Sequence, residues 1–160
     1  MSLHIRPAQP SDAEQILAFI TELADYERAR HEVIASVEDI QRTLFGADAT
    51  AHGLMCLKDN QPIGFAVYFF NYSTRQGRNG LYLEDLYVSP SQRGSGAGKA
   101  LLKQLAREAC AKGCGRFEWS VLDWNEPAIQ FYKSIGALPQ DEWVRYRMEG
   151  DGLRRFAEAD

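Results

Sequence analysis

The sequence predicts an α/β protein built on a mixed central sheet that is mostly antiparallel, with one parallel pair and helices on both faces. Three apolar stretches in the middle of the chain, joined by short polar segments, are typical of an antiparallel meander. The last of these stretches leads through a glycine-rich loop into an amphipathic helix and then into a further apolar stretch. A strand, helix and strand in that order predict a parallel pair with a right-handed crossover.

The N-terminal part of the chain predicts one short strand and two helices. Leu3–Arg6 has strand character and is closed by a proline. Ser11–Glu14 has the pattern of a capping box, and the helical spacing of the apolar residues after it predicts a helix that runs to about Ala29. A second, shorter helix is expected to start at Ser36 and to end near Gly46.

The meander occupies the middle of the chain. Its strands are expected at Leu54–Lys58, Ile63–Tyr72 and Leu81–Val88. The first two are joined by a tight turn at Asp59–Pro62, made of common turn residues, which predicts a hairpin. The polar loop Ser73–Gly80 leads into the third strand.

The C-terminal part of the chain predicts two more helices and two more strands. A helix starting at Ala97 is expected to stop at Gly113, and a strand follows at Arg116–Leu122. A helix opened by Asn125 as N-cap is expected to end at Gly136. Glu142–Met148 is then the last predicted strand, before a charged tail at 151–160 that can become helical.

Composition predicts one compact domain over residues 1–160 and excludes some classes of protein. The chain has 160 residues and is 45% hydrophobic, which is enough to build a core. Its net charge of -4 disfavours a nucleic-acid module that binds through charge alone. No apolar run approaches the roughly 18 residues of a membrane span, and the N-terminus lacks the pattern of a leader peptide, so we expect a cytoplasmic protein. The three cysteines and three histidines form no metal-ligand pattern, so no metal site is expected.

Three phosphate-binding patterns compete for the glycine-rich loop. The Walker A pattern needs glycine and a hydroxyl residue where this chain has Arg93 and Ala100. The dinucleotide pattern needs glycine where the chain has Lys99. The pattern that fits is Arg-x-x-Gly-x-Gly, formed by Arg93, Gly96 and Gly98.

This loop resembles the pyrophosphate loop of the GNAT family of N-acetyltransferases, and the resemblance extends over nearly the whole chain. The stretches that resemble the diamine (spermidine/spermine) branch are IRPA at 5–8, LADYE at 23–27, GFAVYFF at 64–70, LYLEDLYV at 81–88 and WNEPAIQFYKSIGA at 124–137. The predicted order of elements agrees with the fold of that family. The resemblance therefore implies a GNAT fold and an acetyl-CoA-dependent N-acetyltransferase that modifies a primary amine of a small molecule.

The resemblance also implies which residues hold acetyl-CoA. Backbone amides of the loop would bind its pyrophosphate, since glycines allow close approach of the backbone. The strand before the loop would pair with the pantetheine arm through its backbone, and Asn125 would contact the cofactor. The expected cofactor-binding residues are Leu86, Tyr87, Val88, Arg93, Gly94, Ser95, Gly96, Ala97, Gly98, Lys99 and Asn125.

The implied chemistry needs a base and an acid. An alkylamine has a pKa near 10.4, so only roughly one molecule in a thousand is neutral at pH 7. Glu84 matches the family's base, acting directly or through a water, and Tyr132 matches the acid that protonates the leaving thiolate. Asp85 and Glu27 would hold the substrate's positive charge. Because successive strand residues point to opposite faces, Glu84 and Asp85 reach one site only where a bulge re-aims one of them.

The loop before the third meander strand departs from the polyamine acetylases. Where they carry an acidic and an aromatic residue, this chain has Ser73 and Arg75, and Arg78 follows. Positive charge near the amine entrance would repel a polycation. We therefore expect a smaller primary amine than spermine, such as a lysine-like or thialysine-like amino acid whose carboxylate Arg75 would engage.

Two other functions are compatible with the same fold. One is a non-catalytic acyl-CoA sensor, which the presence of Glu84 and Tyr132 disfavours. The other is acetylation of a protein lysine or N-terminus, which needs an open groove. Family members are usually homodimers, and Trp143–Met148 is expected to contribute to a shared edge.

Overall fold

The structure, a computed structural model, describes residues 2–160. The chain divides into two compact units, one reaching to Leu122 and the other starting at Asp123. Each unit is described separately below, so the prediction of one domain over residues 1–160 stays a prediction.

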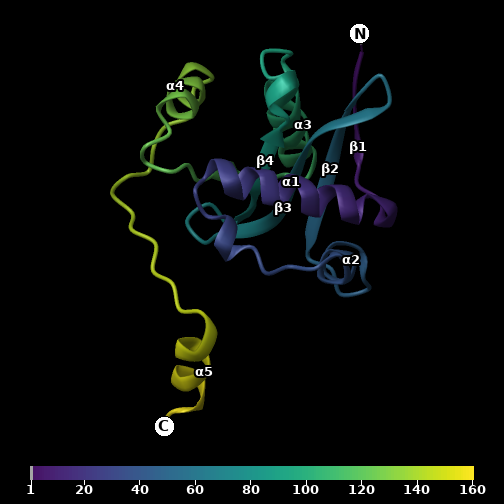
Figure 1. Cartoon of the computed structure of the whole chain (residues 1–160). Helices are drawn as coiled ribbons and strands as arrows, with labels where there is room; N and C mark the ends of the chain where they lie inside the picture. Colours follow the sequence, from purple (N-terminus) through teal and green to yellow (C-terminus); the bar gives the residue numbers. More distant parts are fainter. Residues whose placement is uncertain (1) are drawn as a thin grey trace. The chain divides into compact units, whose positions relative to one another are not determined.

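The first unit contains a five-stranded mixed sheet, which confirms the predicted fold class (Figure 1). The strands follow the order β1-β2-β3-β4-β5, with antiparallel neighbours from β1 to β4 and a parallel pair between β4 and β5. Their bounds are Leu3–Pro7 for β1, Ala51–Lys58 for β2, Gln61–Ser73 for β3, Arg78–Val88 for β4 and Arg116–Trp119 for β5.

Local turn chemistry explains the meander. Asp59 and Asn60 join β2 to β3 with φ angles of 52° and 67°, and two successive positive φ angles define the tight hairpin turn that matches strand twist. At the other end of β3, the Ser73 side-chain oxygen accepts a hydrogen bond from the Gln76 amide at 3.2 Å. The carbonyl of Ser73 accepts a second one from Gly77 at 2.9 Å. The loop is therefore shorter than predicted, and β4 starts at Arg78.

Helices cover both faces of the sheet. The helices of the first unit are α1 (Ala13–Tyr26), α2 (Val37–Phe45) and α3 (Ala97–Ala111). The side chains that α1 and α2 bury against the sheet are Ala13, Ile16, Phe19 and Ile40, which pack with Met55, Leu57, Phe65 and Tyr87 of β2, β3 and β4. Strand residues alternate between faces, so Leu81 and Leu83 turn to the opposite face, where α3 buries Leu101 and Leu105.

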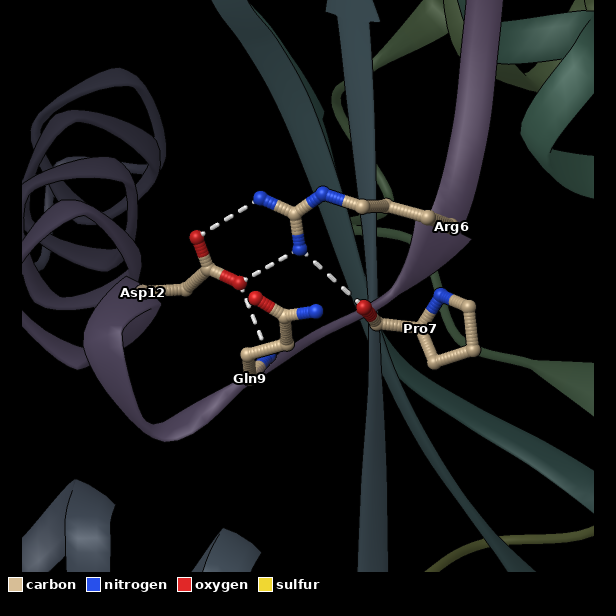
Figure 2. A network of polar contacts seen from close by, with 4 residues as sticks. All are labelled: Arg6, Pro7, Gln9 and Asp12. Carbon is tan, nitrogen blue, oxygen red and sulfur yellow. Dashed lines mark hydrogen bonds and ion pairs between the residues drawn. The ribbon is translucent and has the colours of Figure 1, made fainter.

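The start of α1 corrects one prediction. Ser11 does not cap the helix, because it lies inside a short 3-10 turn at Pro10–Asp12, and Asp12 takes the N-cap position. The Asp12 carboxylate accepts hydrogen bonds from the Arg6 guanidinium at 2.7 and 3.0 Å and from the Gln9 amide at 2.7 Å (Figure 2). The charged partner on β1 thus decides the local geometry, and the pair ties the first strand to the first helix.

The second unit contains two helices, α4 (Glu126–Ser134) and α5 (Gly150–Glu158), so the charged tail is helical. The predicted strand at Glu142–Met148 is wrong, since these residues form no strand. Extended backbone becomes a strand only when a neighbouring strand satisfies its hydrogen bonds, and an apolar pattern does not supply that neighbour. Asn125 precedes α4 as predicted, but its side chain makes no capping hydrogen bond. In the described chain, no helix is long and apolar enough to cross a membrane.

Candidate functional site

A β-bulge in β4 brings two acidic side chains to one face of the sheet. Asp85 pairs with Val67 and Leu83 pairs with Tyr68, so Glu84 is an extra residue without a partner on β3. Asp85 lies on the same face as Phe65 and Tyr87, the face covered by α1, whereas Leu83 lies on the α3 face. A bulge of this kind re-aims a side chain. It is the feature that the sequence analysis required for Glu84 and Asp85 to reach one site.

Glu27 completes a group of three carboxylates that influence one another. It is the residue directly after α1. Loss of hydration, together with the negative charges of Glu84 and then Glu27, raises the pKa of Asp85 to about 6. The pKa of Glu27 is also raised, first by loss of hydration and then by the charge of Glu84. Carboxylates that repel one another in this way favour a cation between them.

The two strands of the parallel pair separate beside these acids. Their ladder runs from Gly80 opposite Arg116 to Leu83 opposite Trp119. Beyond it, β4 continues to Val88 against β3 alone. Among residues 2–160, no strand pairs with the outer edge of β4 from Glu84 to Val88. An open edge of this kind offers its backbone groups to an extended ligand.

The glycine-rich loop follows the Val88 end of that edge. Gly94 and Gly96 have φ angles of 87° and 86°, and no atom lies within 4 Å of the position that a side chain would occupy. The first hydrogen bond of α3 runs from the Ala100 amide to Gly96. The amides of the residues between them therefore have no partner within the helix. The first turn of α3 also lacks acidic residues, so this end of the helix suits an anion.

Two of the predicted loop amides are already used within the loop. The amides of Arg93 and Ser95 donate to the carbonyls of Pro90 and Gln92, both at 3.3 Å. The expected set of anion-binding amides thereby narrows to Gly94 and the four residues from Gly96 to Lys99.

The Arg93 side chain fastens the loop to the strand and helix beside it. Its Nε donates to the carbonyl of Val88 at 3.3 Å, and its guanidinium carbon lies 5.3 Å from the ring centre of Tyr26 and 5.7 Å from that of Tyr87. The Tyr87 hydroxyl in turn donates to Glu22 at 3.0 Å. Because Tyr26 directly precedes Glu27, these contacts connect the loop to the group of carboxylates.

One further contact crosses the point where β4 and β5 separate. The hydroxyl oxygens of Tyr82 and Ser120 lie 2.7 Å apart, one residue before the ladder ends on β4 and one residue after it ends on β5. The Tyr82 ring also packs against Phe69, with ring centres 5.2 Å apart. The sequence did not single out Tyr82 or Ser120. Tyr82 stands inside the LYLEDLYV stretch, which was a usable signal, whereas nothing local marks Ser120.

The loop between β3 and β4 lies far from the carboxylates within the chain. Arg78 precedes Glu84 by six residues of strand, which corresponds to about 20 Å. Arg75 lies beyond it, in the turn at the end of the hairpin. Ser73 is 5% exposed and holds the turn through its hydrogen bonds. The structure therefore does not bring Arg75 and Arg78 together with Glu27, Glu84 and Asp85 within the first unit.

Tyr132 and Asn125 belong to the second unit. Tyr132 is half-buried on α4, where its ring centre lies 5.9 Å from that of Phe131. Asn125 is the N-cap residue of that helix. No group of three or more His, Cys, Asp or Glu side chains among residues 2–160 is arranged to hold a metal ion.

Comparison with known proteins identifies the class. The sequence model described as the acetyltransferase (GNAT) family matches residues 16–137. The chain therefore belongs to the GNAT family and is an acetyltransferase. Enzymes of this family use acetyl-CoA.

Individual relatives agree with that assignment. The chain is 40% identical over 167 residues to the thialysine N-epsilon-acetyltransferase of Mus musculus, and the match covers 98% of both sequences. It is 32% identical to the spermidine/spermine N(1)-acetyltransferase-like protein 1 of Homo sapiens, covering 96% of this chain and 23% of that protein. Among solved structures, an integron cassette protein of V. cholerae superposes with a TM-score of 0.82 at 31% identity, covering 99% of both chains.

Proposed function

We propose that this protein transfers the acetyl group of acetyl-CoA to a primary amine of a small molecule, either a diamine or polyamine or an amino acid resembling lysine or thialysine. The observation that carries the proposal is the bulge in β4, which turns Glu84 and Asp85 to one face beside the open edge of the same strand, where the charge of Glu27 also acts on Asp85. A cationic amine at the carboxylates and an acyl donor along the edge would meet at Glu84.

The chain fits acetyl-CoA as the donor. The amides of Gly94 and Gly96–Lys99 suit the pyrophosphate, because the glycines leave open space and the helix start favours an anion. The backbone of Leu86, Tyr87 and Val88 would pair with the pantetheine arm as an added strand. Bound there, acetyl-CoA supplies an acyl group already activated as a thioester.

Glu84 and Tyr132 remain the proposed base and acid. Glu84 takes a proton from the ammonium group, directly or through a water, so that a neutral amine can attack. Tyr132 Oη holds the proton for the leaving thiolate. Asp85 is a second candidate base, since a pKa of about 6 lies closer to the working pH of an enzyme than that of an ordinary carboxylate. Glu27 and whichever of the two carboxylates is not the base would hold the cation.

Replacing Tyr132 tests the mechanism against a non-catalytic acyl-CoA sensor. Tyr132→Phe should lower kcat about 100-fold or more, because it removes a general acid, and should change the Kd for acetyl-CoA by less than about threefold. Steady-state kinetics and calorimetry measure the two quantities. Tyr72→Phe, at a tyrosine of β3 that is 58% exposed, is the control and should leave both unchanged. An unaltered kcat in Tyr132→Phe would remove Tyr132 from the mechanism.

A panel of amines tests the substrate. The thialysine-acetylating relative supports an amino acid, and the spermidine/spermine-like relative supports a polyamine. We expect thialysine and lysine to show a higher kcat/KM than spermine, because this chain has Arg75 in the turn between β3 and β4. A clear preference for spermine would contradict this choice. A peptide carrying lysine, included in the panel, tests acetylation of proteins.

The role proposed for Arg75 needs a second copy of the chain. A distance of about 20 Å along β4 is several times the length of an amino-acid substrate, and charges so far apart are largely screened. Arg75 can therefore engage a substrate carboxylate only at the site of a partner subunit. Arg75→Ala should then raise KM for thialysine while leaving KM for a diamine without a carboxylate unchanged.

A homodimer in the cytoplasm completes the proposal. The segment between α4 and α5 exposes large apolar side chains, with Trp143 64%, Val144 76% and Tyr146 93% exposed. Exposed apolar groups gathered in one segment are typical of an interaction surface. Light scattering should give twice the chain mass of 18.1 kDa, and a monomeric mass would contradict both the dimer and the role of Arg75.

A further inference from the structure

We propose that the hydrogen bond between Tyr82 and Ser120 restricts the acyl group of the donor to a short one. The bond closes the inner end of the slot, which we define as the gap between β4 and β5 beyond Leu83 and Trp119. This inference rests on the acetyl-CoA site proposed above and adds the residues that select the acyl group. Both residues belong to the first unit.

The position of the pair defines one end of the slot. The two strands are paired up to Leu83 and Trp119 and separate beyond them. Tyr82 and Glu118 are opposite each other in the ladder, so their side chains share a face, and Ser120, two residues on, lies on that face as well. With its hydroxyl 2.7 Å from the Ser120 oxygen, Tyr82 therefore bridges the strands at the point where they part.

The direction of the donor places its acyl group at that end. The proposed anion-binding loop follows Val88, so the phosphates would lie at the far end of the open edge. An arm that runs along β4 from there passes Val88 first and reaches Glu84 last. The thioester must lie near Glu84, because the carboxylates hold the attacking amine. The acyl carbons beyond the thioester would then point toward Leu83 and the bridge.

The bridge is held in place by packing as well as by its hydrogen bond. The Tyr82 ring lies against Phe69 with centres 5.2 Å apart and an interplanar angle of 34°. This contact fixes the ring and lets the hydroxyl reach across to β5. A fixed wall discriminates by about 10-fold or more for each methylene that it excludes. A four-carbon acyl group extends two carbons farther toward the bridge than acetyl does, so it would meet this wall first.

Binding of CoA thioesters tests the inference without requiring turnover or a known amine. Calorimetry with the full chain would compare CoA, acetyl-CoA and butyryl-CoA. We expect the unaltered protein to bind acetyl-CoA at least about tenfold more tightly than butyryl-CoA. Tyr82→Ala, which removes the wall, should bring the two affinities within about threefold. Tyr82→Phe and Ser120→Ala, which remove only the hydrogen bond, should give intermediate ratios.

The control and the contrary outcomes separate this inference from the proposed function. Tyr72→Phe removes the hydroxyl of a tyrosine on β3 that is 58% exposed and should leave the ratio unchanged. If the ratio of the affinities for acetyl-CoA and butyryl-CoA is the same in the unaltered protein and in all three bridge variants, this inference is wrong, but the proposed function is not affected. If neither CoA nor its thioesters bind, the proposed cosubstrate is wrong and the inference falls with it.

Discussion

Asp85 shows how one residue acquires its chemistry from its position. On a regular strand it would point away from Glu84. The bulge turns it to the same face, where loss of hydration and two neighbouring carboxylates raise its pKa to about 6. The group is therefore close to half-protonated at mildly acidic pH, and its ability to bind a cation changes with pH in that range.

The pH dependence of the reaction should report this group. As pH falls below about 6, Asp85 becomes neutral, so kcat/KM for the amine should fall. Asp85→Asn should remove this step in the pH profile of kcat/KM. It should also lower kcat/KM at pH 7.5 by about tenfold or more, which is the effect of losing one charged hydrogen bond. Profiles of kcat/KM between pH 5 and 8 would measure both effects. In every variant kcat/KM also rises with pH, because the amine itself loses its proton.

Two further variants complete this experiment. Asp25→Asn, at an exposed carboxylate near the end of α1 that pairs with Arg30 at 2.9 Å, should keep the step near pH 6. Glu84→Gln separates the two candidate bases, because loss of the base lowers kcat whereas loss of a cation-binding group raises KM. A step that persists in Asp85→Asn would assign it to another residue.

At the scale of an element, the glycine-rich loop depends on backbone conformations that other residues adopt poorly. Gly96 is the N-cap of α3 with a φ of 86°, and Gly113 follows the same helix with a φ of 73°. Neither has an atom within 4 Å of the position of a side chain. The two glycines therefore face the same strain on substitution, but only Gly96 borders the proposed anion site.

This symmetry gives a matched pair of variants. Gly96→Ala and Gly113→Ala should each lower the free energy of unfolding by about 1 kcal/mol, the cost of a left-handed conformation for alanine. Gly96→Ala should also weaken acetyl-CoA binding about tenfold, because it displaces amides that bind charged oxygens. Urea unfolding and calorimetry measure the two effects. Equal weakening of binding in both variants would show that stability, not the loop, is responsible.

The position of the glycine-rich loop also depends on a contact between Arg93 and the end of α1. The Arg93 guanidinium lies over Tyr26 and Tyr87, and such contacts stabilise exposed sites by about 0.5–1 kcal/mol each. Tyr26→Leu should therefore weaken acetyl-CoA binding by about two- to fivefold, whereas Tyr26→Phe, which keeps a ring, should not. Calorimetry distinguishes the two, and equal affinities would mean that the contact does not position the loop.

At the scale of the whole molecule, the Arg6–Asp12 pair joins the first strand to the first helix. Asp12 is 8% exposed, and its hydrogen bonds to Arg6 hold its pKa below the usual range. Asp12→Asn should lower the free energy of unfolding by about 2 kcal/mol at pH 7. Because the folded pKa lies below that of the unfolded chain, this contribution is complete above about pH 4. It is lost as the pH falls from there through the folded pKa.

Urea unfolding at pH 7 and pH 3 measures this stability. The difference between the unaltered protein and Asp12→Asn should shrink at the lower pH. Asp25→Asn breaks an exposed pair with Arg30 and should change stability by less than about 1 kcal/mol at either pH. A difference for Asp12→Asn that does not depend on pH would mean that its charge is not what stabilises the fold.

Most of the first unit could be predicted from the sequence because its signals are local. The Asp59–Asn60 turn, the Ser36 cap and the apolar spacing of α3 each depend on residues close together in the chain. The Ser36 side chain accepts a hydrogen bond from the Asp39 amide at 3.0 Å. The similar pattern at Ser11 failed, because the Asp12 carboxylate binds Arg6 on β1 and the Gln9 amide, and Asp12 takes the N-cap position instead.

The sequence by itself determined the class of the fold, the glycine-rich loop and the types of residue that can carry the chemistry, since turns, caps and glycine patterns are local properties of the chain. The tertiary structure alone decided where Glu84 and Asp85 point, how far Arg75 lies from them and that Tyr82 meets Ser120. These facts depend on strand register, which is fixed by pairing between segments distant in sequence. The same dependence explains why Glu142–Met148, strand-like in sequence, forms no strand.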